Sequence, residues 1–356
     1  MKLKKLMEDK KIEGILITDL INLRYFTGFT GTTGIALVTG KGRYFFVDFR
    51  YVSQANDEVV PNGFEVVVIE RPAINKIAEI LEDEGIKRLG IEDENVTLSS
   101  YNKYVEKFEN VEFVTLGDSF TRVRMIKTED EIKNLKKAAE IGDEAFARIL
   151  PLIKEGAVEK DIKTELEYEM KKLGAEGPSF DTIIASNYRS AMPHGVASDK
   201  KIEREGFVKF DFGCFYNGYA SDMTRTIYYG EQPSEKHLEI YNTVLEAQLK
   251  AIEAVKVGVS TRELDKIARD YITSKGYGEN FGHGLGHGVG LVIHELPNVS
   301  GKAEDFILEE NMVITIEPGI YIDGFGGVRI EDDIVVKKDG YEILNKTTKE
   351  LVIINN

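Results

Sequence analysis

The sequence predicts a mixed protein in two parts: an α/β layer domain over residues 1–122, then an α+β domain over residues 128–356 built as an internal two-fold repeat. Three observations support this. Short β-rich runs alternate with helical patterns in the first third of the chain. Residues 145–174 align with residues 247–276. Two pairs of acidic residues recur in the strand-rich segments that follow the two aligned stretches.

The first third reads as a layered α/β domain. A helix is expected over residues 74–81, and strands are expected at 14–17, 35–38, 44–47, 66–69 and 89–91. The glycine-rich run at 28–34 has a composition also found in phosphate-binding loops. Its spacing is not that of a nucleotide loop, and a strand rather than a helix follows it, so a plain connection is favoured.

The boundary between the two domains is expected near residues 122–127. Thr128 and Glu131 form a capping-box pattern, which marks the beginning of a helix. Apolar residues then repeat at helical spacing, at Ile132, Leu135, Ala139, Phe146 and Ile149. No low-complexity linker separates the two domains, so we expect them to pack closely.

The aligned stretches share their glycines. Gly156 corresponds to Gly258, and Gly174 corresponds to Gly276. Each copy reads as a helix, a link that contains glycine, and a second helix closed by glycine, with strands after it. The simplest interpretation is a duplicated unit in which each copy contributes one sheet.

The acidic pairs flank turn-like segments. Asp211 and Asp222 lie on either side of residues 215–218, and Glu317 and Glu331 lie on either side of residues 323–326. A hairpin that folds at such a midpoint places its two acids across from each other on one face. Asp211 and Glu317 also belong to or follow apolar strands, which argues against a merely solvated charged face.

A glycine-rich run at residues 281–290 separates the two pairs and presents imidazole groups. Four converging carboxylates repel one another, so a site of this kind is stable only with cations between them. The sequence therefore predicts a metal site shared by the two repeats.

Composition sets the remaining bounds. The 356 residues are 42% hydrophobic and 30% charged, which is typical of a globular protein. No apolar run approaches the roughly 20 residues that span a bilayer, and no signal-peptide pattern is present, so a cytoplasmic location without membrane contact is expected. The net charge of −15 argues against nucleic acid as a partner. The single cysteine, Cys214, excludes an internal disulfide and is interpreted as a buried filler.

The motifs together resemble the pita-bread metallopeptidases, in particular their proline-specific branch, aminopeptidase P and prolidase. The motifs that carry this resemblance are at residues 211–213, 218–226, 284–290, 294–297, 316–319 and 328–332. Residues 22–29 also resemble the creatinase-type N-terminal domain of that branch. The resemblance therefore covers essentially the whole chain.

The resemblance implies a centre of two divalent metal ions. The implied ligands are Asp211, Asp222, His287, Glu317 and Glu331. In this family pattern Asp211 chelates one metal, His287 and Glu317 bind the other, and the remaining two acids bridge them. Oxygen-rich ligation with one imidazole suits manganese or cobalt best, with zinc or iron as alternatives.

The resemblance also implies residues that act on a substrate. Glu317 is the candidate for moving a proton from water to the leaving amine. His194 and His294 would line the substrate site and donate hydrogen bonds to the carbonyl oxygen. Phe180 and Tyr321 are further candidates for substrate contact, with a packed strand tyrosine an equal alternative for Tyr321. Arg329, Thr224 and His283 are expected to support the acidic ligands from behind, with simple packing an equal alternative for His283.

Several functions remain open. The preferred one is removal of the first residue from peptides with proline at the second position, an Xaa-Pro aminopeptidase, and the alternative is an Xaa-Pro dipeptidase (prolidase). A methionine aminopeptidase would share the five ligands but would not usually carry this N-terminal domain. A metal-free creatinase-like amidinohydrolase and a catalytically silent binding scaffold use the same architecture. A homodimer is expected from the resemblance.

Overall fold

The computed structural model describes residues 2–70 and 72–355. The chain divides into two compact units, residues 1–123 and 124–356, each with its own hydrophobic core. The domain limits expected from the sequence, 122 and 128, stay predictions, because a domain is defined by its ability to fold alone. Within the described ranges, no helix combines the length and apolar character needed to cross a membrane.

The first unit is a six-stranded mixed sheet with helices on both faces. Its helices are α1 (Lys2–Lys10), α2 (Leu20–Thr27), α3 (Val52–Glu58), α4 (Ile74–Glu84), α5 (Leu98–Lys107) and, at its end, α6 (Ser119–Met125). Its strands are β1 (Gly14–Ile17), β2 (Ile35–Thr39), β3 (Arg43–Val47), β4 (Glu65–Val68), β5 (Arg88–Ile91) and β6 (Glu112–Thr115), in the order β4-β3-β2-β1-β5-β6. Short 3₁₀ turns lie at Phe49–Tyr51 and Val60–Asn62.

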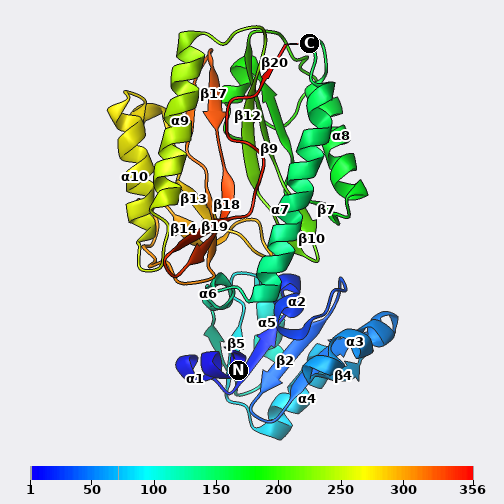
Figure 1. Ribbon diagram of the computed structural model, residues 1–356. Coiled ribbons are helices and arrows are strands. Elements are labelled where there is room, and N and C mark those ends of the chain that lie inside the picture. Colours follow the sequence, from blue (N-terminus) through cyan, green and yellow to red (C-terminus); the bar gives the residue numbers. More distant parts are fainter. Residues whose placement is uncertain (1, 71, 356) are drawn as a thin grey trace. The chain divides into compact units, whose positions relative to one another are not determined.

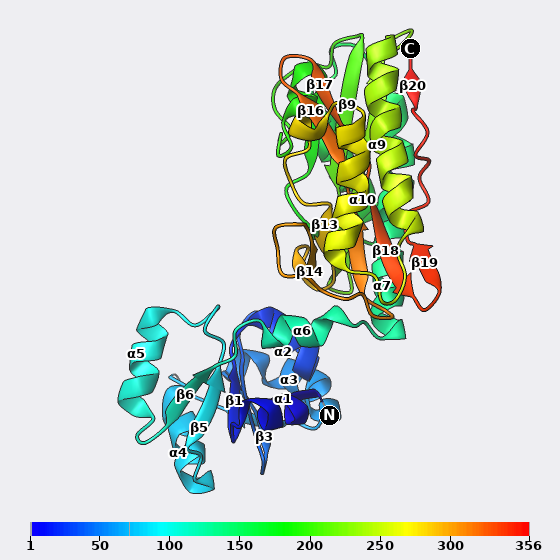
Figure 2. The ribbon, with the colours of Figure 1, turned by 90° about the vertical axis from the view of Figure 1, so that its left-hand side faces the viewer.

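Alternating side chains of the strands build two separate cores in this unit. Ile15 and Ile17 pack against α1, α2 and α3, whereas Leu16 packs against α4 and α5 on the opposite face (Figure 2). This period of two is what a strand buried on both faces requires. The five predicted strands are all present. The sixth, β6, lies at the sheet edge and is partly exposed, so its sequence lacks the apolar run that identified the others.

The second unit contains the predicted repeat. Its helices are α7 (Glu129–Ile149), α8 (Glu159–Lys172), α9 (Glu235–Glu253) and α10 (Thr261–Ser274), with 3₁₀ turns at Leu150–Leu152, Asn187–Ala191 and Gly278–Asn280. The strands after α8 are β7 (Gly177–Pro178), β8 (Ile183–Ser186), β9 (Gly206–Phe212), β10 (Cys214–Tyr216), β11 (Tyr219–Ala220) and β12 (Met223–Tyr229). The strands after α10 are β13 (Gly286–Gly288), β14 (Glu295–Val299), β15 (Val313–Ile316), β16 (Gly319–Ile322), β17 (Gly326–Arg329), β18 (Asp332–Lys337), β19 (Gly340–Ile343) and β20 (Ile353–Ile354).

The two helix pairs flank the strands. Helices α7 and α8 pack on β8, β9 and β12, and α9 and α10 pack on the sheet that contains β15 and β18 (Figure 1). The capping box that opens α7 is formed, since Thr128 accepts from the Glu131 backbone and the Glu131 side chain accepts from the Thr128 backbone.

Matching glycines confirm the repeat at the level of the backbone. Gly156 and Gly258, in the links between paired helices, have φ of 80° and 92°. Gly174 and Gly276, after the second helix of each pair, have φ of 107° and 87°. Only glycine adopts these positive angles without strain, so both copies need glycine at both places.

Both acid-bearing hairpins are formed, but they place their acids differently. Ile316 pairs with Asp332 and Gly319 with Arg329, so Glu317 lies directly across from Glu331, as predicted. In the other hairpin Asp211 pairs with Thr224. Its register places Asp222 across from Gly213, two positions along the strand from Asp211. The predicted direct opposition of Asp211 and Asp222 is therefore wrong, although both acids share one face of the hairpin.

Gly213 allows this hairpin to close tightly. A Cβ atom at Gly213 would lie 1.8 Å from the backbone oxygen of Ser221 on the opposite strand. We predict that Gly213→Ala lowers the free energy of unfolding of the second unit by roughly 1–3 kcal/mol, because the two strands must separate. Urea denaturation followed by circular dichroism measures this change.

Gly177→Ala is the matched control. Gly177 also lies in a strand of this hairpin's sheet, and a Cβ atom there meets nothing within 4 Å. The control variant should unfold at the wild-type urea concentration. Equal midpoints for the two variants would refute the proposed close contact.

Candidate metal centre

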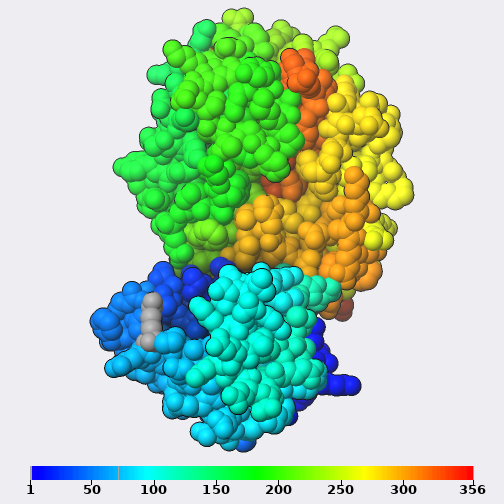
Figure 3. Space-filling model, turned by 180° about the vertical axis from the view of Figure 1, so that it is seen from behind, coloured from blue at the N-terminus to red at the C-terminus, as the bar shows by residue number. Residues whose placement is uncertain are grey.

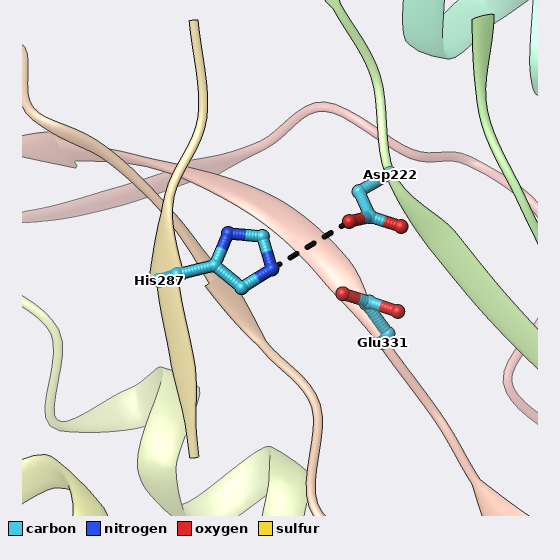
Figure 4. Close-up of side chains that lie close together, drawn as sticks. All are labelled: Asp222, His287 and Glu331. Carbon is cyan, nitrogen blue, oxygen red and sulfur yellow. Dashed lines mark ion pairs between the residues drawn. The ribbon is translucent and has the colours of Figure 1, made fainter. Parts of the chain in front are cut away.

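Three residues from different strand segments form the centre of the site. Asp222 follows β11, Glu331 follows β17, and His287 lies in β13. One ligand atom of each lies within 4.8 Å of those of the other two, and all three residues are buried. Figure 4 shows the imidazole pointing toward the two carboxylates. The two repeats therefore meet at this point, as the sequence predicts.

The other two acids line the same cavity, which has a volume of about 750 Å³. His287 Nε2 lies 3.5 Å from Glu317 Oε1 and 3.7 Å from Asp222 Oδ2. Asp211 stands apart from this group, because its Oδ2 is held by an ion pair with Arg329 Nη2. All five predicted ligands are thus brought to one cavity wall, with Asp211 turned toward an arginine.

His287 is oriented for ligation. Its Nδ1 lies 3.0 Å from the Gly288 carbonyl oxygen, which can only accept, so Nδ1 carries the proton. Burial lowers the pKa of His287 to about 3. The imidazole is therefore neutral at physiological pH, and the lone pair of Nε2 faces the acids.

The acids are unstable as a cluster of bare charges. Burial, followed by repulsion from neighbouring acids, raises the pKa of Asp222 and of Glu331 well above the ordinary range. Burial raises the pKa of Glu317 to about 8. Among the described residues, Asp222 Oδ1 is buried without a hydrogen-bond partner. An oxygen-rich set with one imidazole fits divalent cations, which would offset this charge.

Thr224 and Arg329 hold the acids from behind. Thr224 Oγ1 donates to Glu331 Oε2 at 2.6 Å and accepts from Arg329 Nε at 3.0 Å. Arg329 Nη1 donates to the Tyr321 hydroxyl at 2.8 Å. That hydroxyl lies 2.9 Å from His283 Nε2, whose Nδ1 faces the Gly284 carbonyl. A continuous hydrogen-bonded chain thus runs from His283 to the acids.

This chain changes the interpretation of Tyr321. Both partners of its hydroxyl are protein groups, and the residue does not line the cavity. Burial also raises the pKa of Tyr321 to about 12. The Tyr321 hydroxyl is thus part of the support of the acids, and its contact with a substrate stays a prediction.

The remaining predicted residues lie on the cavity surface. Phe180, His194 and His294 all line it, and the rings of His294 and His287 are 4.3 Å apart. The cavity is bounded by residues 180–196 on one side and 283–303 on the other. These segments, green and yellow to orange, meet along a seam in the space-filling view (Figure 3).

The sequence analysis missed three charged residues around this cavity. Asp333 accepts from the Asp222 backbone at 3.0 Å, although the acidic run 331–333 resembles a solvated face. Lys209 is fully buried in β9, two residues before Asp211. Lys302 lies at the cavity edge. A lysine within the apolar strand 207–212 is the same signal that identified Asp211, so Lys209 could have been found.

Comparison with known proteins places these features in a family. Residues 133–338 match metallopeptidase family M24, and residues 1–126 match the creatinase/prolidase N-terminal domain. The chain is 48% identical to the Xaa-Pro dipeptidase from Bacillus anthracis, with a TM-score of 0.96 over 99% of both chains. It is 44% identical to the Xaa-Pro dipeptidase of Pyrococcus furiosus, over 99% of this chain and 98% of that protein. It is 41% identical to the X-Pro aminopeptidase from Thermotoga maritima MSB8, with a TM-score of 0.91 over 98% of this chain and 100% of the other. The chain therefore belongs to metallopeptidase family M24 and begins with a creatinase/prolidase N-terminal domain.

Proposed function

We propose that the protein is a metal-dependent Xaa-Pro dipeptidase. The observation that carries this proposal is the buried cluster of acids and His287 in a chain whose relatives over full length include Xaa-Pro dipeptidases. The sequence alone favoured the aminopeptidase, and the names of these relatives favour the dipeptidase instead. Aminopeptidase activity is the second candidate, because the chain is also similar to the X-Pro aminopeptidase from Thermotoga maritima.

The position of Lys302 at the cavity edge supports the assignment as a dipeptidase. Lys302 is exposed and lines the cavity, and its ammonium group makes no hydrogen bond or ion pair with the residues that the structure describes. A dipeptide ends in a carboxylate next to its scissile bond, whereas a longer peptide has a neutral amide there. An unpaired ammonium group at this edge therefore favours the shorter substrate.

The proposed chemistry divides among the residues of the site. The five ligands would hold two divalent ions, with manganese or cobalt preferred, and these ions would activate water and polarise the scissile carbonyl. Glu317 accepts the proton of the attacking water and passes it to the leaving proline nitrogen. His194 and His294 donate hydrogen bonds to the carbonyl oxygen as negative charge develops on it. The homodimer and the cytoplasmic location stay predictions.

The complete ligand set separates this proposal from the other uses of the fold. A creatinase-like amidinohydrolase needs no metal, and a binding scaffold has no need to keep all five ligands. Neither alternative explains why five metal-binding side chains are gathered at one cavity.

We predict that Xaa-Pro dipeptides are cleaved with a higher kcat/KM than matched Xaa-Pro-Yaa tripeptides. A second comparison tests the role of the substrate carboxylate. An Xaa-Pro dipeptide should be cleaved with a higher kcat/KM than the same dipeptide with a C-terminal amide. Both are measured with manganese or cobalt added. Faster cleavage of the tripeptides would move the assignment to the aminopeptidase, and cleavage of Xaa-Ala controls at equal rates would remove the proline specificity.

Lys302→Met provides the control for this interpretation. The variant should lose much of the preference for the free acid over the amide, and it should keep the wild-type kcat/KM for the amide. An unchanged preference would show that Lys302 does not sense the carboxylate.

We predict two divalent ions per chain in the reconstituted protein, measured by elemental analysis. Asp222→Asn and Glu331→Gln should each lose both ions, because these acids would be shared between them. Asp211→Asn should lose mainly one. A wild-type protein that stays free of metal after reconstitution would favour the creatinase-like or scaffold alternatives.

We predict that His194→Ala and His294→Ala each lower kcat by about 100- to 1000-fold, the usual effect of losing one donor to a developing oxyanion. Metal content should be unchanged, because neither side chain belongs to the acid cluster. Loss of metal from either variant would instead make that histidine a ligand.

A further inference from the structure

Lys209 is a buried lysine that the proposed chemistry does not use. It lies in β9 with no exposed surface, in a strand whose other inner residues are apolar or are Asp211. Its Nζ donates to the Met192 carbonyl at 2.6 Å and lies 3.4 Å from the Pro193 carbonyl. The same nitrogen lies 5.0 Å from the centre of the Tyr321 ring.

The two carbonyls belong to the residues directly before His194. A buried arginine, Arg329, also donates to the Pro193 carbonyl, at 3.2 Å. A tight turn follows, because the Gly195 backbone N–H donates to the Met192 carbonyl at 3.1 Å. The backbone that leads into His194 is therefore tied to two side chains of the acid-bearing hairpins.

His194 depends on this attachment. Its side chain is exposed at the cavity, and its imidazole forms no hydrogen bond with residues 2–70 and 72–355. The backbone at residues 192–193 therefore sets the point from which the imidazole reaches into the cavity.

We propose that Lys209 is a positioning residue that holds His194 over the cavity by binding the carbonyls of Met192 and Pro193. This inference rests on the proposed function only in giving His194 a catalytic role. Both the ammonium and the neutral amine of lysine carry N–H groups, so the attachment does not depend on the charge of Lys209.

Stability alone does not account for a lysine at this place. Removing an amine from water is costly, and a methionine of similar length would fill the space without that cost. A purely structural role would therefore be served better by an apolar side chain. The lysine is explained by the two carbonyls that it fixes.

Lys209→Met tests the proposal. We expect kcat/KM to fall by about 10- to 100-fold, the effect of a small displacement of a catalytic group. Metal content should stay at the wild-type level, and the melting temperature should stay equal or rise. A variant that melts much lower and loses metal would overturn the proposal, because Lys209 would then support the fold.

A double-mutant cycle shows whether Lys209 acts through His194. In the His194→Ala background, Lys209→Met should change kcat/KM by less than about 2-fold, because the group that it positions is gone. Effects that multiply would overturn the proposal. Lys200→Met is the matched control, since Lys200 binds the Lys201 carbonyl in the same segment and should leave activity unchanged.

A spectroscopic test needs no activity and therefore separates this proposal from the proposed function. The chain has five histidines, so the imidazole signals can be assigned by NMR with His194→Ala as the reference. In Lys209→Met the His194 signal should shift or broaden, while that of His237, packed between Phe207 and Phe325, should not. An unmoved His194 signal would overturn the proposal. If the methionine variant is insoluble, Lys209→Gln takes its place. Because glutamine keeps an N–H donor, the change in the His194 signal and the loss of kcat/KM should both be smaller than those expected for methionine.

Discussion

Repulsion among buried carboxylates is the constraint on which the architecture of the second unit depends. Burial and mutual charge raise the pKa of Asp222 and Glu331 well above the usual range, so each acid opposes the placement of the others. No single hairpin can bring four acids together against this repulsion. The two hairpins must be fixed to each other by contacts stronger than the tendency of the acids to separate.

Those contacts lie directly behind the acids. The Glu331 backbone donates to the Thr224 carbonyl at 3.1 Å, and Asp333 accepts from the Asp222 backbone. Arg225 donates to the Glu331 carbonyl at 2.6 Å and pairs with Asp332. Asp211, Asp222 and Glu331 are thus each held by a residue of the opposite repeat. Cations bound at the front of the cluster would act on the same carboxylates as this cross-bonding at its back.

Local patterns in the sequence were sufficient for the repeat, the hairpins and the four acids at the cavity, whereas the choice of His287 came from the family resemblance. The equal spacing of glycines such as Gly156 and Gly258 in the two aligned stretches identifies the repeat. The turn-like segments at 215–218 and 323–326 locate the hairpins. The offset of Asp222 from Asp211 was not predictable, because register depends on which residues actually pair. The burial of Asp332 was not predictable either, since its partners Arg225, Gln248 and Lys349 are distant in sequence. The hydrogen bonds of the Tyr321 hydroxyl were not predictable for the same reason, since His283 comes from another segment.

The cross-bonding between the repeats also limits how such a protein can change. Thr226 and Arg329 exchange hydrogen bonds across the repeats, as do Thr224 and Glu331. A substitution on one side leaves an unmatched polar group on the other, so its effect depends on the residue already present there. The effects of substitutions in the two repeats are thereby coupled. A chimera that takes one half from a distant relative would need the facing half of this contact from the same source.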